Sequence, residues 1–226
     1  MGLKLAIWDV DGTLVDSRAM IQQAMVAAFE ACQLVPPDYD QTRRIVGLDL
    51  SVACQQLAPE GYRDLPRLIE AYKQSFIALR AQPDFDEALY PGALSMLETL
   101  AAEGWLLAIA TGKSHRGLEA LFEAHPIKPY FDSIWCADDG PGKPHPFMCE
   151  QAMSRLGVAA EQSLIIGDAI HDMRMGQNAR ISTIGISWGF GRTAELKDAG
   201  AQHVCESFQE LRNVLTIFQE NSKIIT

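Results

Sequence analysis

The chain has 226 residues, of which 48% are hydrophobic and 21% charged, and this balance is that of an ordinary globular protein, not of a disordered or fibrous one. It carries 29 Asp and Glu residues against 19 Lys and Arg, which gives a formal net charge of −10. Such an acidic surface argues against binding to nucleic acid or to anionic membranes, and no stretch approaches the roughly 18 apolar residues that a membrane helix needs.

The N-terminal part of the chain predicts one strand followed by a helical insertion. The apolar run Leu3–Trp8 predicts a buried strand, and residues 16–87 then show helical periodicity and turn signals but no convincing strand. The sequence Tyr90-Pro91-Gly92 marks the return to a different pattern. Two helical faces are expected inside the insertion, one formed by Ile21, Met25, Ala28 and Cys32 and the other by Leu68, Tyr72, Ser75 and Leu79.

From residue 91 onward, short apolar runs alternate with longer helical periodicities. Strands that are apolar on both faces and separated by helices imply a parallel sheet covered on both sides. The expected fold class is therefore α/β, with a Rossmann-like core at residues 1–15 and 88–226 and an inserted helical cap at residues 16–87. The further strands are expected at Trp105–Ala110, Ser133–Cys136, Ser163–Ile166, Thr183–Ser187 and His203–Cys205, and the helices between and after them at Ala93–Ala102, His115–Ala124, Pro146–Leu156, His171–Ala179, Thr193–Ala199 and Phe208–Phe218.

Two carboxylates follow the first expected strand, in the string Asp9-Val10-Asp11-Gly12-Thr13. Side chains at the carboxyl edge of an open α/β sheet face the place where ligands bind, and Gly12 lets the backbone turn closely around a ligand. An acidic Asp-Gly turn alone is common. The complete string D-x-D-G-T-x-x-D after an apolar strand is much more specific.

Three further motifs follow in order: Ala110-Thr111-Gly112-Lys113, Gly142-Lys143-Pro144, and the run from Gly167 to Asp172 that reads G-D-A-I-H-D. Together with the first string they resemble the four motifs of the haloacid dehalogenase superfamily, in the branch of phosphatases with a helical cap inserted after the first motif. The phosphoglycolate phosphatase-like group is the most similar. The resemblance implies Mg²⁺-dependent hydrolysis of a small phosphomonoester through an aspartyl phosphate, with a phosphoglycolate-like substrate favoured.

The resemblance and the requirements of phosphoryl transfer assign roles to four residues. Asp9 is expected to be the nucleophile. Asp11 is expected to protonate the leaving oxygen and then to deprotonate water. Thr111 is expected to donate its hydroxyl to the phosphate, and Lys143 to supply a fixed positive charge.

The same resemblance implies a metal site formed by Asp9, the backbone carbonyl of Asp11, Asp168 and Asp172. For Asp172 the alternative is a role in orienting Lys143 or a metal-bound water. The four carboxylates carry −4 if ionised and Lys143 returns only +1, so a phosphate dianion would be repelled from the bare site. Ligation by oxygen alone favours Mg²⁺ over zinc.

Further residues are expected to bind the substrate. Gly12, Thr13, Gly112 and Lys113 adjoin the motifs, although a lysine at the start of a helix is commonly exposed to solvent. Arg43 and Arg44 precede Ile45-Val46-Gly47-Leu48, which resembles the cap segment that closes over the substrate in this branch. One of the two arginines is expected to clamp a substrate carboxylate, and the alternative is a salt bridge on the cap surface.

Other functions are compatible with parts of this pattern. A β-phosphoglucomutase-like phosphosugar mutase shares the four motifs but generally carries a cap histidine shortly after the first motif, where this chain has the residues S-R-A-M-I at 17–21. A pyrophosphatase of the same fold is a second alternative, because Trp188-Gly189-Phe190-Gly191 resembles a loop of phosphoglycolate and pyrophosphate phosphatases. True dehalogenases lack the aspartate that is Asp11 here. A non-catalytic protein that binds a phosphorylated ligand is the alternative from another class, but every principal motif position is intact.

The cysteines indicate the compartment. There are five, an odd number without a C-x-x-C pair, which predicts reduced thiols and a cytoplasmic location. No histidine pairs with a cysteine at the spacing of a zinc site. The expected partner is a small phosphorylated metabolite, with no nucleic acid and no membrane, and the expected assembly is a monomer or a homodimer.

Overall fold

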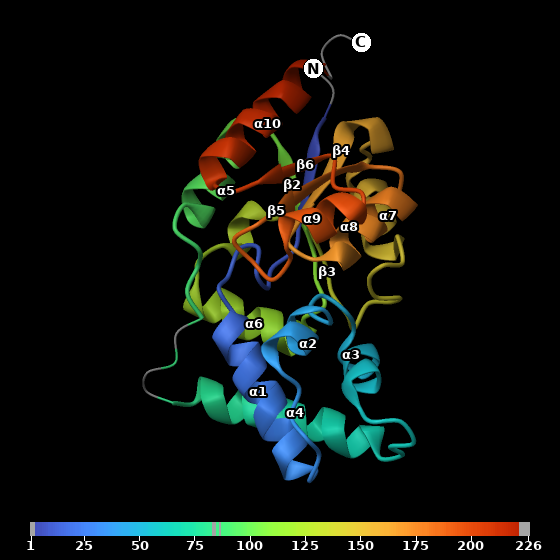
Figure 1. The fold of residues 1–226 in the computed structure, drawn as a ribbon. Coiled ribbons are helices and arrows are strands. Elements are labelled where there is room, and N and C mark those ends of the chain that lie inside the picture. The colour runs from blue at the N-terminus through green and yellow to red at the C-terminus, as the bar shows by residue number, and fades with distance from the viewer. Residues whose placement is uncertain (1–2, 83–84, 86, 222–226) are drawn as a thin grey trace.

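The computed structural model describes residues 3–82, 85 and 87–221. Six parallel strands form one sheet in the order β3-β2-β1-β4-β5-β6, which confirms the predicted α/β fold (Figure 1). The first strand lies inside the sheet, with Ile7 in register with Ala108 on one side and with Ile165 on the other. The strands are β1 (Leu5–Trp8), β2 (Leu106–Ala110), β3 (Ser133–Trp135), β4 (Ser163–Gly167), β5 (Ser182–Ile186) and β6 (His203–Cys205).

Helices cover both faces of the sheet because successive strand residues point to opposite sides. Trp8 belongs to one buried cluster with Leu97 and Leu211, whereas Ile7 belongs to another with Met148. None of the helices in the described part of the chain is long and apolar enough to cross a membrane. The core helices are α5 (Ala93–Ala102), α6 (His115–Ala124), α7 (Phe147–Leu156), α8 (Ile170–Asn178), α9 (Thr193–Asp198) and α10 (Phe208–Asn221), with 3-10 turns at Lys128–Tyr130 and Ala160–Gln162.

The insertion after β1 is helical, as predicted, and consists of α1 (Arg18–Ala31), α2 (Tyr39–Arg43), α3 (Leu50–Leu57) and α4 (Leu65–Arg80). Aspartates fix where three of these helices begin, since the side chains of Asp38, Asp49 and Asp64 each accept a backbone N–H of the first turn. Helices α1 and α4 pack together, and one buried cluster contains the whole predicted face of α1 but only Leu68 and Tyr72 of the face predicted for α4, without Ser75 and Leu79. Residues 83, 84 and 86 of the expected insertion lie outside the described residues.

The two connections between insertion and core run side by side. Val15 pairs with Leu89 in an antiparallel bridge, the Asp16 amide donates to the Ala88 carbonyl at 2.9 Å, and the Tyr90 amide donates to the Leu14 carbonyl at 2.9 Å. The insertion lies beyond the carboxyl edge of the sheet, below the core in Figure 1. The division at 15/16 and 87/88 remains a prediction that these paired connections support.

Candidate active site

The topology brings three of the sequence motifs to one edge of the sheet. Asp9 directly follows β1, Thr111 directly follows β2 and Asp168 directly follows β4. Because these strands are parallel neighbours in the order β2-β1-β4, their carboxyl ends lie side by side. Asp172 reaches the same place from the first turn of α8.

A buried acidic cluster forms the floor of this site. Asp9, Asp168 and Asp172 each offer a carboxylate oxygen, and these oxygens all lie within 4.8 Å of one another. The ammonium of Lys143, with a side-chain exposure of 0%, lies 2.6 Å from Asp9 Oδ1 and 2.6 Å from Asp172 Oδ1. Three carboxylates and one ammonium leave a formal charge of −2 among side chains that are almost completely buried.

Neighbouring groups hold two of these carboxylates in place. Asp168 accepts a hydrogen bond from the Thr13 hydroxyl at 3.0 Å and another from the Phe190 amide at 2.7 Å, and Asp172 accepts one from the Ala169 amide at 3.0 Å. A Cβ at Gly12 would collide with the Asp168 carboxylate, and Gly12 also has a φ of +79°. The glycine is therefore required both by its backbone conformation and by the close approach of Asp168.

The crowding of charges shifts the acid–base properties of the cluster. Burial raises the pKa of Asp9 to about 7, against the lowering effect of Lys143 and with a further raising effect from Asp172. Burial likewise raises the pKa of Asp168 well above its usual range. Burial by itself would lower the pKa of Lys143, but the Asp172 and Asp9 carboxylates have the larger effect and raise this pKa. Lys143 therefore stays charged, whereas the carboxylates need a further cation to be fully ionised.

The residues of the cluster fit a divalent metal ion. Asp9 Oδ2 is buried and has no hydrogen-bond partner among the described residues. The available donors are carboxylate oxygens, which suit Mg²⁺ better than softer metals, and a charge of +2 would balance the formal −2 of the cluster.

Asp11 belongs to a second charge network that the sequence patterns did not indicate. Lys113 lies 2.9 Å from Asp11 Oδ1 and 2.6 Å from Glu87 Oε1, and the other Glu87 oxygen is 2.9 Å from Arg80. The Lys113 side chain is only 7% exposed, so it is not the solvent-exposed helix start that was the alternative. Its ammonium is engaged by two protein carboxylates.

Thr111 and Gly112 border the same site where the insertion approaches the core. The Thr111 hydroxyl accepts the Lys113 amide at 3.2 Å, and the Gly112 amide donates to no described residue. A Cβ on Gly112 would lie 2.9 Å from the carbonyl oxygens of Gly47 and Leu48. The cap segment around Gly47 therefore rests directly on this part of the core.

Other predicted binding residues lie elsewhere. The Thr13 hydroxyl is used by Asp168, and the Gly12 amide donates to the Val15 carbonyl at 2.9 Å, so both residues shape the turn. The structure does not bring Arg43 or Arg44 to the cavity lining. Arg43 is buried and binds Glu195 through two bonds of 2.6 and 2.9 Å, an ion pair between cap and core.

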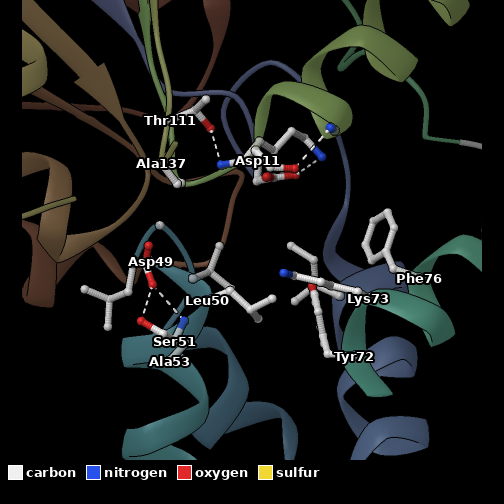
Figure 2. A pocket seen from close by; sticks show the side chains of 18 of the residues that line it. Asp11, Asp49, Leu50, Ser51, Ala53, Tyr72, Lys73, Phe76, Thr111 and Ala137 are labelled. Carbon is white, nitrogen blue, oxygen red and sulfur yellow. Dashed lines mark hydrogen bonds and ion pairs between the residues drawn. The ribbon is translucent and has the colours of Figure 1, made fainter. Parts of the chain in front are cut away.

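A cavity of about 650 Å³ lies between the cap and the edge of the sheet (Figure 2). Asp9, Asp11, Thr111, Gly112 and Lys113 line its core side. Its cap side consists of the segment from Ile45 to Ser51 and of residues from α1, α3 and α4, most of them apolar. Asp9 of the acidic cluster thus lines a space whose opposite wall is formed by the insertion.

One residue of this site, Glu87, carries no sequence signal of its role. Glu87 is the last of three acids in the stretch D-F-D-E at the end of the insertion, and nothing local indicates that it, of the three, binds Lys113. Gly189 and Phe190 are different, because they belong to the Trp188-Gly189-Phe190-Gly191 loop, which resembles a loop of phosphoglycolate and pyrophosphate phosphatases. The Phe190 amide binds Asp168, and a Cβ on Gly189 would collide with that carboxylate.

Comparison with known proteins gives consistent results. Residues 6–186 match a family model described as haloacid dehalogenase-like hydrolase. A probable phosphatase IndB from Dickeya dadantii is 35% identical over 210 residues, covering 92% of this chain and 91% of that protein. A phosphoglycolate phosphatase from Agrobacterium fabrum is 30% identical over 189 residues, covering 82% and 81%. A solved hydrolase structure from Pseudomonas syringae superposes with a TM-score of 0.84 at 30% identity and covers 94% of this chain and 98% of that one.

Proposed function

The chain belongs to the haloacid dehalogenase-like hydrolase family, and we propose that within it this protein is a Mg²⁺-dependent phosphatase that hydrolyses a small phosphomonoester through an aspartyl phosphate. The observation that carries the proposal is the position of Asp9. It lies at the floor of the cavity, beside Lys143 and two residues before Asp11, and its Oδ2 has no partner in the part of the chain that the structure describes.

In the first half of the proposed reaction a carboxylate oxygen of Asp9 attacks the phosphorus and the bond from phosphorus to the leaving oxygen breaks. Asp11 gives its proton to that oxygen, so the product leaves as an alcohol. In the second half Asp11 takes a proton from water, the water oxygen attacks the phosphorus, and the bond to Asp9 breaks. Inorganic phosphate leaves, and both aspartates return to their starting states.

The remaining motif residues position these groups. Lys143 holds Asp9 from one side and keeps its charge throughout, because two carboxylates flank it. The Thr111 hydroxyl and the Gly112 amide are the proposed donors to the phosphate oxygens. Asp9, Asp168 and Asp172 would hold Mg²⁺, with the Asp11 carbonyl as the ligand that the family resemblance adds. When bound, the ion supplies positive charge that neutralises the phosphate oxygens in the transition state.

The insertion is the proposed means of excluding water. Its segment at Gly47 and Leu48 covers Gly112. It joins the core through two chain segments that run side by side at Val15 and Leu89, and these two segments are the proposed hinge. The two linkers near Asp16 and Glu87 would flex as the cap opens for substrate and closes for chemistry.

Among phosphomonoesters, a phosphoglycolate-like substrate is the first candidate, because relatives along nearly the whole chain bear the name phosphoglycolate phosphatase. A phosphosugar mutase is disfavoured because residues 16–87 contain no histidine. A cytoplasmic location is supported by the five cysteines, which are all buried and unpaired.

Hydrolysis of p-nitrophenyl phosphate tests the proposal. The wild type is expected to release p-nitrophenol with Mg²⁺ and not after chelation, and Asp9→Asn is expected to abolish turnover while the far-UV circular dichroism stays that of the wild type. Wild-type protein that is folded but inactive with Mg²⁺ against p-nitrophenyl phosphate and a panel of phosphomonoesters would overturn it.

A further inference from the structure

Lys73 is a cation on the cap wall of the cavity. It follows Tyr72 on α4, and Figure 2 shows its side chain extending into the cavity, across from Asp11 and Thr111 on the core side. It is exposed, and it makes no ion pair or hydrogen bond with any described residue. Its charge is therefore available to a ligand.

The other cations of the cavity lining differ in this respect. Arg80 is neutralised by Glu87, and Lys113 by Asp11 and Glu87. Arg116 on α6 has no ion-pair partner among the described residues, but it belongs to the core side. Lys73 is thus the unneutralised cation that the described part of the cap presents to the cavity.

The wall around Lys73 is apolar. Met25 and Ile69 line the cavity beside the aromatic rings of Tyr72 and Phe76, whose centroids are 6.0 Å apart. Cavities of roughly 300–1,000 Å³ hold ligands of drug size, so a cavity of about 650 Å³ has room for much more than the few atoms of glycolate. A leaving group that buries carbon atoms against these apolar walls gains the most binding free energy from them.

We propose that Lys73 binds an anionic group at the far end of the leaving group, and that the preferred substrates are phosphomonoesters in which an apolar chain or ring separates the phosphate from this second anion. The inference rests on the proposed function and deepens it. A lysine ammonium is a compact charge without the planar pair of donors that arginine has, so it binds either a carboxylate or a second phosphate at that position.

The test uses alkyl phosphates whose leaving oxygens have similar basicity. Hexyl phosphate and 6-phosphooxyhexanoate differ only in the distal anion, hexane-1,6-diyl bisphosphate replaces the carboxylate by a phosphate, and phosphoglycolate is the short anionic reference. The wild type is expected to have a lower KM for 6-phosphooxyhexanoate than for either hexyl phosphate or phosphoglycolate. The bisphosphate shows which distal anion binds better.

Lys73→Met keeps most of the length of the side chain and its helix propensity, and it removes the charge. We expect it to raise the KM for 6-phosphooxyhexanoate about tenfold, the value of one hydrogen bond to a charged group in a partly solvated site, with kcat and the KM for hexyl phosphate changed less than twofold. Lys73→Glu should reverse the preference between the two substrates. Lys197→Met, an exposed lysine on α9 outside the cavity, is the matched control and should behave as the wild type.

The outcomes separate the two proposals. If the wild type hydrolyses none of these esters with Mg²⁺, the proposed function fails. If it hydrolyses all of them but Lys73→Met leaves the ratio of kcat/KM for the anionic and neutral hexyl esters unchanged, the assignment of Lys73 is wrong and the phosphatase proposal stands. A loss of the ratio in Arg116→Met but not in Lys73→Met would move the anion site to the core and overturn the inference.

Discussion

Gly112 offers a direct test of whether the contact between cap and core matters for catalysis. A Cβ added there would lie 2.9 Å from the carbonyl oxygens of Gly47 and Leu48, whereas ordinary contact begins at 3.4 Å. The cap segment would have to withdraw by about 0.5 Å, and overpacking of this kind costs about 1–3 kcal/mol. The backbone of Gly112 is not in the left-handed region, so alanine brings no conformational strain of its own.

We therefore expect Gly112→Ala to lower kcat/KM for p-nitrophenyl phosphate by about tenfold or more. Destabilising the closed position of the cap by about 1.4 kcal/mol lowers the ratio of closed to open molecules tenfold. Amide hydrogen exchange of residues 45–49 should become faster in the same variant. Gly117→Ala is the control, because its nearest neighbour would be 3.6 Å away and its helical position favours alanine. Wild-type kcat/KM and wild-type exchange in Gly112→Ala would refute the argument that closure over Gly112 is required.

Three further predictions concern charges and their partners. The first uses Asp9, whose carboxyl pKa is raised from 3.8 to about 7 on folding, so the wild type without divalent cations should lose stability as pH rises from 5 toward 7. Asp9→Asn has no such group. Its free energy of unfolding, measured by urea titration, should therefore exceed that of the wild type by more at pH 8 than at pH 5. Thr13→Val should weaken the activation of hydrolysis by Mg²⁺ about tenfold, because it removes the hydrogen bond that orients Asp168. Glu195→Gln should lower the free energy of unfolding by about 1–2 kcal/mol at pH 7 and by little at pH 2. The Arg43 side chain lowers the pKa of Glu195 from 4.5 to about 2, so the ion pair stabilises the fold fully above pH 4.5 and this stabilisation is lost as pH falls toward 2. The first prediction is wrong if Asp9→Asn differs from the wild type by the same amount at pH 5 and pH 8. The second is wrong if Thr13→Val leaves activation by Mg²⁺ unchanged, and the third if Glu195→Gln lowers stability equally at pH 7 and pH 2.

The fold was predictable because its information is local. Buried parallel strands are apolar on both faces and helices carry a period of 3.6, so β6, α5 and α6 begin and end where the patterns place them. Most other core elements differ from prediction by one or two residues at an end, and α10 continues to Asn221 beyond the expected Phe218. The convergence of Asp9, Thr111 and Asp168 follows from strand order alone.

The partners of individual side chains were not predictable in the same way. Thr13 meets Asp168 across 155 positions of the chain and Arg43 meets Glu195 across 152. Such pairs depend on how cap, core and loops pack, and no local pattern encodes that packing. The same holds for Lys113, whose position at a helix start is typical of an exposed residue although the closed cavity buries it between two carboxylates.

These pairings change the charge balance at the site. The sequence alone places four aspartates against Lys143, which requires both a cation and a proton on Asp11 to approach neutrality. In the structure Asp11 has its own counter-charge in Lys113, while Arg80 compensates Glu87. The cluster that remains, Asp9, Asp168, Asp172 and Lys143, has a formal charge of −2, which one divalent ion would balance. In the proposed phosphatase the field at a bound phosphate would thus be set by paired charges within a few ångströms and not by the net charge of −10.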